Sequence, residues 1–132
     1  MRVVFDTNIL LSSTLWAGSV AQKLLFKLIK NDVKIFTSEA ILSEYSGVLK
    51  RDFGYSEKET QNIMGKVVLF ANLVAPIEKL DVVRDDPEDN KVIECAIASS
   101  SDYLITYDKH LLKIKSFRKI NIITPEEAFG LI

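Results

Sequence analysis

Short apolar runs rich in β-branched residues alternate along the chain with segments of helical periodicity. The apolar runs predict five strands, at Val3–Phe5, Lys34–Phe36, about Leu73–Ala75, Tyr103–Thr106 and Asn121–Ile123. The first, fourth and fifth are continuous apolar stretches, as expected of strands that helices cover on both faces. Strands that alternate with helices in this way are typical of βαβ units. The pattern therefore predicts an α/β fold with a parallel sheet.

Helical periodicity fills most of the segments between these strands. The expected helices cover residues 19–30, 38–50, 56–71, 88–99 and 125–131. Residue types that favour the start of a helix stand near four of these boundaries, namely Ser19, Ser38, Ser56 and the pair Thr124 and Pro125. One long polar connection, Glu78–Glu88, leads into an acidic stretch. No internal repeat or linker divides the chain.

The composition is that of an ordinary globular protein. The 132 residues are 48% hydrophobic and 27% charged, with a formal net charge of −1. No apolar run approaches the roughly 20 residues of a membrane span, and the N-terminus enters a strand without the long apolar region of a signal peptide. We therefore expect a cytoplasmic protein without membrane contact, in which residues 1–132 form a single domain.

The single cysteine and single histidine leave few options for catalysis. Cys95 has no partner for an internal disulfide, and no set of zinc ligands can be built around it. A small buried residue is the better interpretation of Cys95. A Ser-His-Asp or Cys-His arrangement would need His110, whose Asp-Lys-His-Leu setting resembles the start of a helix. Candidate chemistry therefore rests on carboxylates.

Two aspartates stand where predicted strands end. Asp6 directly follows Val3–Phe5, and Asp108 follows Tyr103–Thr106 after one residue. Ligands of α/β folds gather at the carboxyl edge of the sheet, so both positions favour a functional role. The alternative is that each aspartate caps a turn or a helix, which this residue type does well.

Two further acids lie on the inward side of predicted helices. At about 100° per residue, Glu44 falls at the margin of the apolar arc of helix 38–50. Asp89 falls in line with the core stripe of helix 88–99, which directs it toward the sheet. Glu44 could instead lie over the rim of the core. The acids around Asp89 could form a capping cluster, in which Asp86 is the rival for its role.

Four carboxylates at one edge of a sheet would repel one another. Two at about 4 Å cost on the order of 4 kcal/mol at an effective dielectric constant near 20. Such a cluster persists only if protons or cations neutralise it. Oxygen ligands without His or Cys favour Mg²⁺ or Mn²⁺ over zinc. These acids therefore predict metal-dependent hydrolysis of phosphodiesters, with one or two ions.

Basic residues flank the acidic stretch. Residues 109–119 hold five Lys and Arg and no acid, whereas residues 81–94 hold six acids. An acidic pocket beside basic flanks suits a metal site that acts on a phosphate polymer. The alternative is a set of solvated surfaces. Candidate contacts to RNA are Lys109 and, on the outer face of helix 19–30, Lys23, Lys27 and Lys30.

The order and spacing of these residues resemble the PIN domain family over essentially the whole chain. The resemblance rests on four features: Asp6-Thr7-Asn8 after a strand, Glu44 on the second helix, Asp-Pro-Glu-Asp-Asn-Lys at 86–91, and Tyr-Leu-Ile-Thr-Tyr-Asp at 103–108. It looks closest to small stand-alone, VapC-like PIN proteins, the toxins of toxin–antitoxin pairs.

This resemblance implies a three-layer α/β/α fold, with a short, mainly parallel central sheet flanked by helices. It also implies an Mg²⁺- or Mn²⁺-dependent endoribonuclease with an RNA substrate, a homodimer or higher oligomer and, in the toxin branch, a small antitoxin partner. The catalytic and metal-binding acids that it implies are Asp6, Glu44, Asp89 and Asp108. The residues that it implies as hydrogen-bonding supports of these acids are Asn8, Asn90 and Thr106.

Tyr107 departs from the family pattern, which often has Gly at this position. A bulky side chain there could narrow the cleft or turn Asp108 away. Tyr107 therefore favours the alternative of a catalytically degenerate PIN domain that binds RNA or protein, whereas the intact set of acids favours a nuclease. A haloacid dehalogenase-like phosphatase needs a second Asp where this chain has Asn8, and a response-regulator receiver needs paired acids at the first strand. The sequence therefore predicts a metal-dependent ribonuclease.

Overall fold

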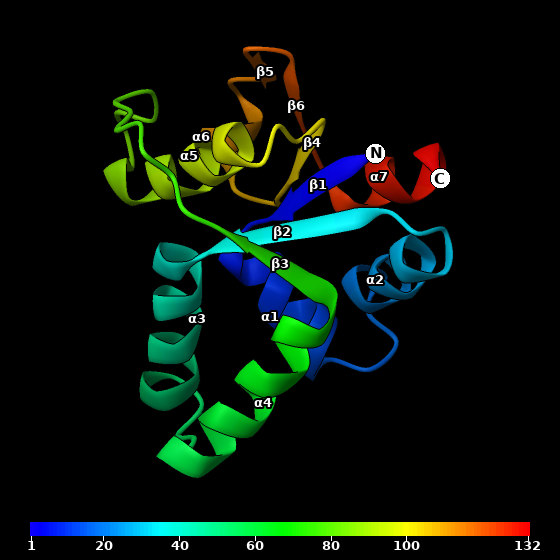
Figure 1. Ribbon diagram of the computed structural model, residues 1–132, viewed down its shortest axis with the longest axis vertical. Coiled ribbons are helices and arrows are strands. Elements are labelled where there is room, and N and C mark those ends of the chain that lie inside the picture. Colours follow the sequence, from blue (N-terminus) through cyan, green and yellow to red (C-terminus); the bar gives the residue numbers. More distant parts are fainter.

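A six-stranded sheet runs through the middle of the computed structural model, which describes residues 1–132 (Figure 1). Its strand order is β3-β2-β1-β4-β6-β5. Only β5 is antiparallel to its neighbour. The strands are β1 (Arg2–Phe5), β2 (Lys34–Ser38), β3 (Ala71–Val74), β4 (Tyr103–Ile105), β5 (Ser116–Phe117) and β6 (Ile120–Ile123). All five predicted strands are present, with ends shifted by one or two residues.

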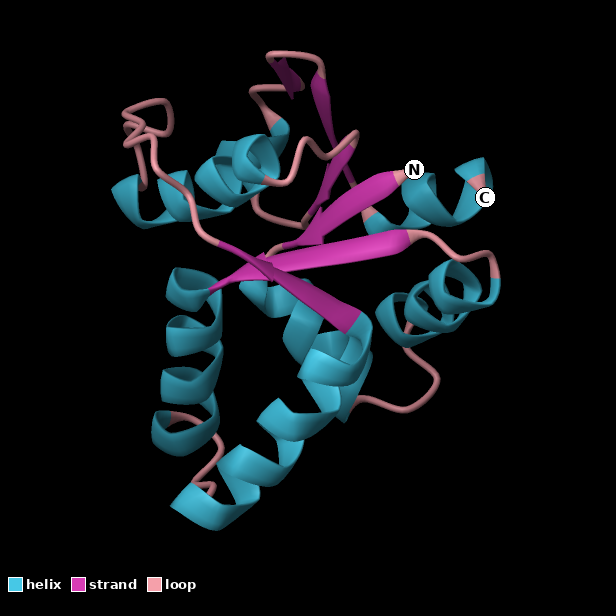
Figure 2. Cartoon of the chain, viewed as in Figure 1, coloured by secondary structure: helices cyan, strands magenta, loops and turns pink.

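Helices cover both faces of the sheet. The helices are α1 (Thr7–Leu15), α2 (Val20–Lys30), α3 (Glu39–Arg51), α4 (Glu57–Phe70), α5 (Asn90–Ala98), α6 (Lys109–Leu112), α7 (Pro125–Leu131) and the 3₁₀ turn η1 (Pro87–Asp89). Figures 1 and 2 show α5 and α6 on one side of the strands, and α1, α3 and α4 on the other. This is the predicted three-layer α/β/α arrangement.

Helix α1 is the main element that the sequence pattern did not predict. Its apolar and hydroxyl residues lie all around the helix, so no stripe of period 3.6 marks it. The hydroxyls of Ser12, Ser13 and Thr14 bond back to carbonyls of the preceding turn, which satisfies them inside the helix. Asp6 is the N-cap of α1, as the capping alternative expected.

Strand β5 was also missed, because its hairpin turn lacks the usual signal. The turn residues Arg118 and Lys119 adopt positive φ angles of 47° and 71°. Hairpin turns with two such residues usually contain Gly or Asn, and neither stands here. The hairpin pairs Phe117 with Ile120 at the edge of the sheet.

The core is one connected cluster of 28 buried hydrophobic residues on both faces of the sheet. Tyr45 of α3 is fully buried, and its hydroxyl lies 2.7 Å from the Thr14 hydroxyl of α1. No single helix is long and apolar enough to cross a membrane; α1 and α2 reach that length and composition only as a pair bent by 88°.

The parallel strands end together at one edge, and this edge positions the site. The Asp6 amide continues the ladder beyond β1 by donating to the Ile105 carbonyl at 3.0 Å. The Thr106 amide does the same for β4, donating to the Ile123 carbonyl at 2.9 Å. Residues that follow β1 and β4 are therefore held side by side at the carboxyl edge of the sheet.

Candidate metal centre at the carboxyl edge of the sheet

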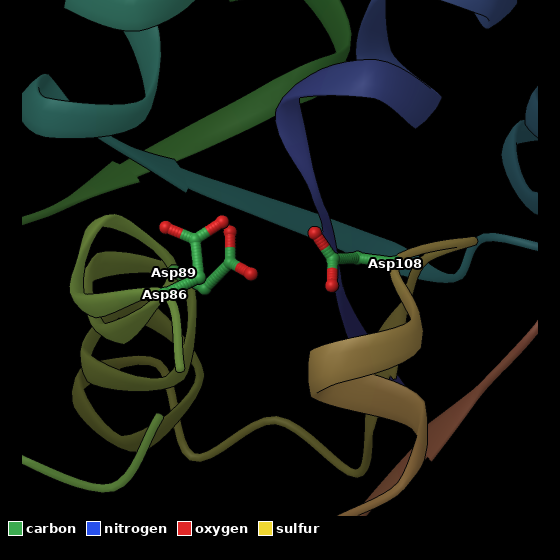
Figure 3. A group of neighbouring side chains, drawn as sticks. All are labelled: Asp86, Asp89 and Asp108. Carbon is green, nitrogen blue, oxygen red and sulfur yellow. The ribbon is translucent and has the colours of Figure 1, made fainter. Parts of the chain in front are cut away.

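Three aspartates from two sides of this edge form the most compact acidic cluster. Asp86, Asp89 and Asp108 each offer a carboxylate oxygen, and these oxygens lie within 4.8 Å of one another. Figure 3 shows Asp86 and Asp89, at the start of α5, facing Asp108 across the gap. The sequence treated Asp86 as the rival of Asp89, but the η1 turn brings both to the same place.

Asp6 lies beside this cluster and is held by two hydrogen bonds. Its Oδ1 accepts from the Thr7 amide at 2.7 Å, and its Oδ2 accepts from the Thr106 hydroxyl at 2.8 Å. Burial raises the pKa of Asp6, the two hydrogen bonds oppose that rise, and the charges of Glu44 and Asp108 add to it. Asp6 is therefore a buried acid whose charge acts directly on the cluster.

Thr106 connects Asp6 to Asp108. Its hydroxyl accepts from the Asp108 amide at 2.9 Å while donating to Asp6 Oδ2. The residue is fully buried, and its bond to Asp6 is shielded from water. Thr106 thus makes the kind of supporting contact that the sequence resemblance implied. Asp108 has a second task, because its Oδ1 accepts from the His110 amide at 2.7 Å and caps α6.

Glu44 reaches the same edge from α3 but is engaged by other partners. Its Oε2 accepts from the Thr7 hydroxyl at 2.6 Å and lies 3.1 Å from the ammonium nitrogen of Lys91. The Lys91 side chain is only 15% exposed. Burial opposes its charge, but Glu44 and then Glu88 raise the pKa of Lys91 above its usual value. The sequence pattern did not predict Thr7 and Lys91 as partners of Glu44. The available signal was that Thr7 directly follows Asp6 and that Lys91 lies two residues after Asp89.

Asp89 is the most perturbed acid of the site. Burial and the nearby carboxylates of Asp108, Asp6 and Asp86 raise the pKa of Asp89 to about 8. Its Oδ2 is buried without any hydrogen-bond partner. An unpaired buried carboxylate oxygen is costly, and a cation would satisfy it. The donor set is all oxygen, so these residues fit a hard divalent ion such as Mg²⁺ or Mn²⁺.

The two asparagines implied as supports behave differently from Thr106. Asn90 is buried, and its Oδ1 accepts from the amides of Val82 and Val83, both at 2.9 Å. Its Nδ2 donates to the Pro87 carbonyl at 3.0 Å. Asn90 therefore braces the loop that carries Asp86 instead of bonding to an acid. Asn8 is exposed, and no hydrogen bond joins its side chain to the cluster.

The lysines predicted on α2 lie away from the acids. Lys27 donates to the Phe129 carbonyl at 2.9 Å, and its ammonium lies 4.1 Å from the centre of the Phe129 ring. Figure 1 shows α2 beside α7, near the amino ends of β1 and β2. The structure thus does not bring Lys23, Lys27 or Lys30 to the carboxyl edge. Lys109 follows Asp108 directly and is exposed.

Tyr107 turns toward α7 and leaves Asp108 in the cluster. Its hydroxyl donates to Glu126 Oε2 at 2.8 Å, and the side chain is 47% exposed. Partial burial and Glu126 raise the pKa of Tyr107 to about 12, so the hydroxyl keeps its proton. The departure from the family pattern at this position therefore does not remove Asp108 from the site.

Comparison with known proteins agrees with this geometry. The PIN domain family model matches residues 2–110, a segment that contains every acid of the site. Uncharacterized protein MJ1680 of Methanocaldococcus jannaschii is 29% identical over 140 residues, which cover 96% of this chain and 88% of the relative. A chain in the crystal structure of VapBC2 from Rickettsia felis, bound to a DNA fragment from their promoter, has the same fold. Its TM-score is 0.68 at 18% identity, over 94% of this chain and 98% of that one. The chain belongs to the PIN domain family.

Proposed function

We propose that this protein is a divalent-metal-dependent endoribonuclease that hydrolyses RNA at the carboxyl edge of its sheet. The observation that carries the proposal is the convergence of Asp86, Asp89 and Asp108, whose oxygens lie within 4.8 Å of one another. The orphaned Oδ2 of Asp89 supports it, because a buried unpaired oxygen in an acidic cluster is a ready ligand for a cation. Membership of the PIN domain family supports the same reading.

The acids take distinct roles in this proposal. Asp86, Asp89 and Asp108 would hold Mg²⁺ or Mn²⁺, with Asp6 and Glu44 completing the acidic cleft. When bound, the cation activates water and stabilises negative charge on the departing oxygen. Thr106 keeps Asp6 and the Asp108 turn in fixed relative positions through its two hydrogen bonds. Such fixed positions limit the reorganisation that catalysis requires.

Charge also explains why RNA binding at this edge would depend on the cation. The cleft is lined by five acidic side chains, and one cation, Lys91, forms an ion pair with Glu44 among them. Like charges at these separations repel strongly. A divalent ion would reverse the local sign and let a phosphate approach. The proposal therefore requires RNA to bind weakly at this edge in metal-free protein.

We also propose, from the comparison with known structures, that this chain has a partner protein. The chain of similar fold comes from VapBC2, a complex bound to promoter DNA. We extend this to a small antitoxin that binds the present protein, and to a homodimeric or larger assembly. A small open reading frame next to the gene, whose product copurifies with this chain and suppresses its ribonuclease activity, would support the extension.

The test of the function is cleavage of a mixed RNA pool by purified protein in Mn²⁺. We expect the wild-type protein to cleave, EDTA to stop it, and Asp89→Asn to lower the rate by about 100-fold or more, the upper range for disturbed metal sites. Asp81→Asn is the matched control, because Asp81 is an exposed residue of the preceding loop.

Two results would contradict the proposal. Equal cleavage by wild-type protein and Asp89→Asn would indicate a contaminating nuclease or a misplaced site. Binding of RNA without cleavage, in Mg²⁺ as well as Mn²⁺, would indicate the alternative of a degenerate PIN domain that acts as a binding module.

A further inference from the structure

Glu44 stands apart from the three clustered aspartates although it belongs to the same acidic cleft. Asp86, Asp89 and Asp108 converge within 4.8 Å, whereas Glu44 is outside this group. Both of its polar contacts use the same oxygen, Oε2, which accepts from the Thr7 hydroxyl at 2.6 Å and lies 3.1 Å from the Lys91 ammonium. The Oε2 atom of the side chain that reaches this edge from α3 is therefore already engaged.

Lys91 is well placed to keep Glu44 in this position. Its side chain is 15% exposed and that of Glu44 is 39% exposed, so this ion pair is less screened by water than a pair between two fully exposed side chains. The second contact of Lys91, to Glu88 at 3.4 Å, involves a carboxylate that is 84% exposed. Glu44 is thus the better shielded partner of this lysine. Thr7, which is buried, adds a hydrogen bond that does not depend on the charge of Lys91.

We propose that Lys91 is a positioning residue that holds Glu44 on Thr7 and outside the ligand set of the first divalent cation. This inference rests on the proposed metal-dependent function. Asp86, Asp89 and Asp108 bind the first ion, and the pair of Glu44 and Lys91 contributes neither a ligand nor a net charge to that event. Oε2 of Glu44 becomes available to a cation only when its contact with Lys91 is broken.

Replacing both Glu44 and Lys91 with uncharged side chains distinguishes a Glu44 held outside the ligand set from a Glu44 that binds the first cation directly. In the double variant Glu44→Gln with Lys91→Met, one negative and one positive charge disappear together, and both side chains keep nearly their original size. The net charge of the cleft is unchanged. Affinity for the first cation should therefore stay at the wild-type value if Glu44 is not a ligand, and should fall if it is.

The single variants should move in opposite directions. Lys91→Met leaves Glu44 unpaired and adds to the negative charge of the cleft, so Mn²⁺ should bind more tightly. Glu44→Gln leaves the ammonium of Lys91 beside the cluster with only the exposed Glu88 as its partner, so Mn²⁺ should bind more weakly. Asp89→Asn removes a carboxylate of the cluster itself and should weaken binding by about tenfold or more.

The experiment is titration of each full-length protein with Mn²⁺, with free Mn²⁺ followed by electron paramagnetic resonance at fixed ionic strength. Lys58→Met is the matched control for loss of a lysine charge, because Lys58 is exposed on α4 and makes no ion pair. Thermal melts check that each variant is folded, and Glu44→Gln with Lys91→Gln serves as a second neutral pair. We expect wild-type affinity in both double variants and tighter binding in Lys91→Met alone.

Each other outcome overturns the inference. Double variants as weak as Asp89→Asn would make Glu44 a ligand of the first ion, which leaves the metal-dependent function standing. Unchanged affinity in Lys91→Met would mean that the lysine does not restrain Glu44. No binding of Mn²⁺ by the wild-type protein would refute the metal-dependent function, and this inference with it.

Discussion

The protonation of Asp89 bears directly on the metal binding proposed for the site. Its pKa of about 8 means that the metal-free protein keeps a proton on this carboxyl at neutral pH. Burial is the largest cause, and the carboxylates of Asp108, Asp6 and Asp86 add to it. A cation must displace this proton in order to bind, so binding should release a proton and strengthen as the pH rises toward 8.

Asp89 also makes the stability of the metal-free protein depend on pH. In the unfolded chain Asp89 loses its proton near its ordinary pKa of 3.8, whereas in the folded protein it keeps the proton up to about pH 8. The folded state binds more protons over this range, so its contribution to the free energy of unfolding falls as the pH rises from about 4 to about 8. We expect Asp89→Asn to gain stability relative to wild type across that range and to level off above it.

Urea denaturation in EDTA at several pH values measures this difference. Asp81→Asn serves as the control, because Asp81 is exposed and outside the cluster. Added Mn²⁺ should stabilise the wild-type protein more than Asp89→Asn, since a ligand stabilises the state that binds it. Stability curves of Asp89→Asn and wild type that run parallel through the whole pH range would show that Asp89 does not have a raised pKa in the folded protein.

At the scale of elements, the site depends on how the η1 turn and the preceding loop are held. The loop has no regular structure between β3 and η1, yet it must deliver Asp86 to within reach of Asp108. Asn90 supplies the brace by accepting from two loop amides and donating to the Pro87 carbonyl. The first residue of α5 thus fixes the segment that precedes it.

Replacing Asn90 should therefore affect both stability and metal binding. Asn90→Ala leaves the amides of Val82 and Val83 without their acceptor, which should cost about 2 kcal/mol of unfolding free energy. Affinity for Mn²⁺ should also fall, because Asp86 loses its support. Asn90→Asp keeps the acceptor and should lose less stability.

Chemical denaturation and Mn²⁺ titration measure the two effects. Asn62→Ala, at an exposed position of α4, is the control. An Asn90→Ala variant with wild-type affinity for Mn²⁺ would show that the loop is held by other contacts.

At the scale of the whole molecule, α5 links the site to the core. It carries Asp89 and Asn90 at its start and packs against β1, β2 and β4. Cys95 lies on its inner side and is completely buried. Burial raises the pKa of the Cys95 thiol to about 12. The single cysteine is therefore a structural residue, as its apolar setting in the sequence predicted.

Cys95 should report on global unfolding. With a pKa of about 12, only about one thiol in ten thousand is ionised near pH 8, and the thiolate is the reactive form. We expect no measurable reaction of the native protein with a thiol reagent at this pH, and rapid reaction in denaturant. Rising urea concentrations should increase labelling in step with loss of the circular dichroism signal. Fast labelling in the absence of denaturant would contradict the burial of α5.

The sequence pattern was sufficient to predict a strand or helix wherever the hydrophobic pattern of that element alone marked it. The predicted strands are present because buried β-branched runs between turn residues leave few other conformations. Asp6 and Asp108 were predicted as site residues from their place after strands, and Asp89 from its helical phase; the structure brings them to the same edge, and their roles stay predictions. Helix α1 was missed because it has no polar face, and β5 because its turn uses Arg118 and Lys119 in a conformation that usually calls for Gly or Asn.

The sequence by itself thus determined the succession of strands and helices along the chain and the acids that follow them. Hydrophobic periodicity and position in the chain can both be read from the linear sequence. Only the tertiary structure decided that Asp86 joins Asp89 and Asp108, that Asn90 bonds to a loop, and that Glu44 is held by Thr7 and Lys91. These contacts join elements that come together only when the sheet forms. Their partners are chosen by distance and direction in space, which spacing along the chain does not encode.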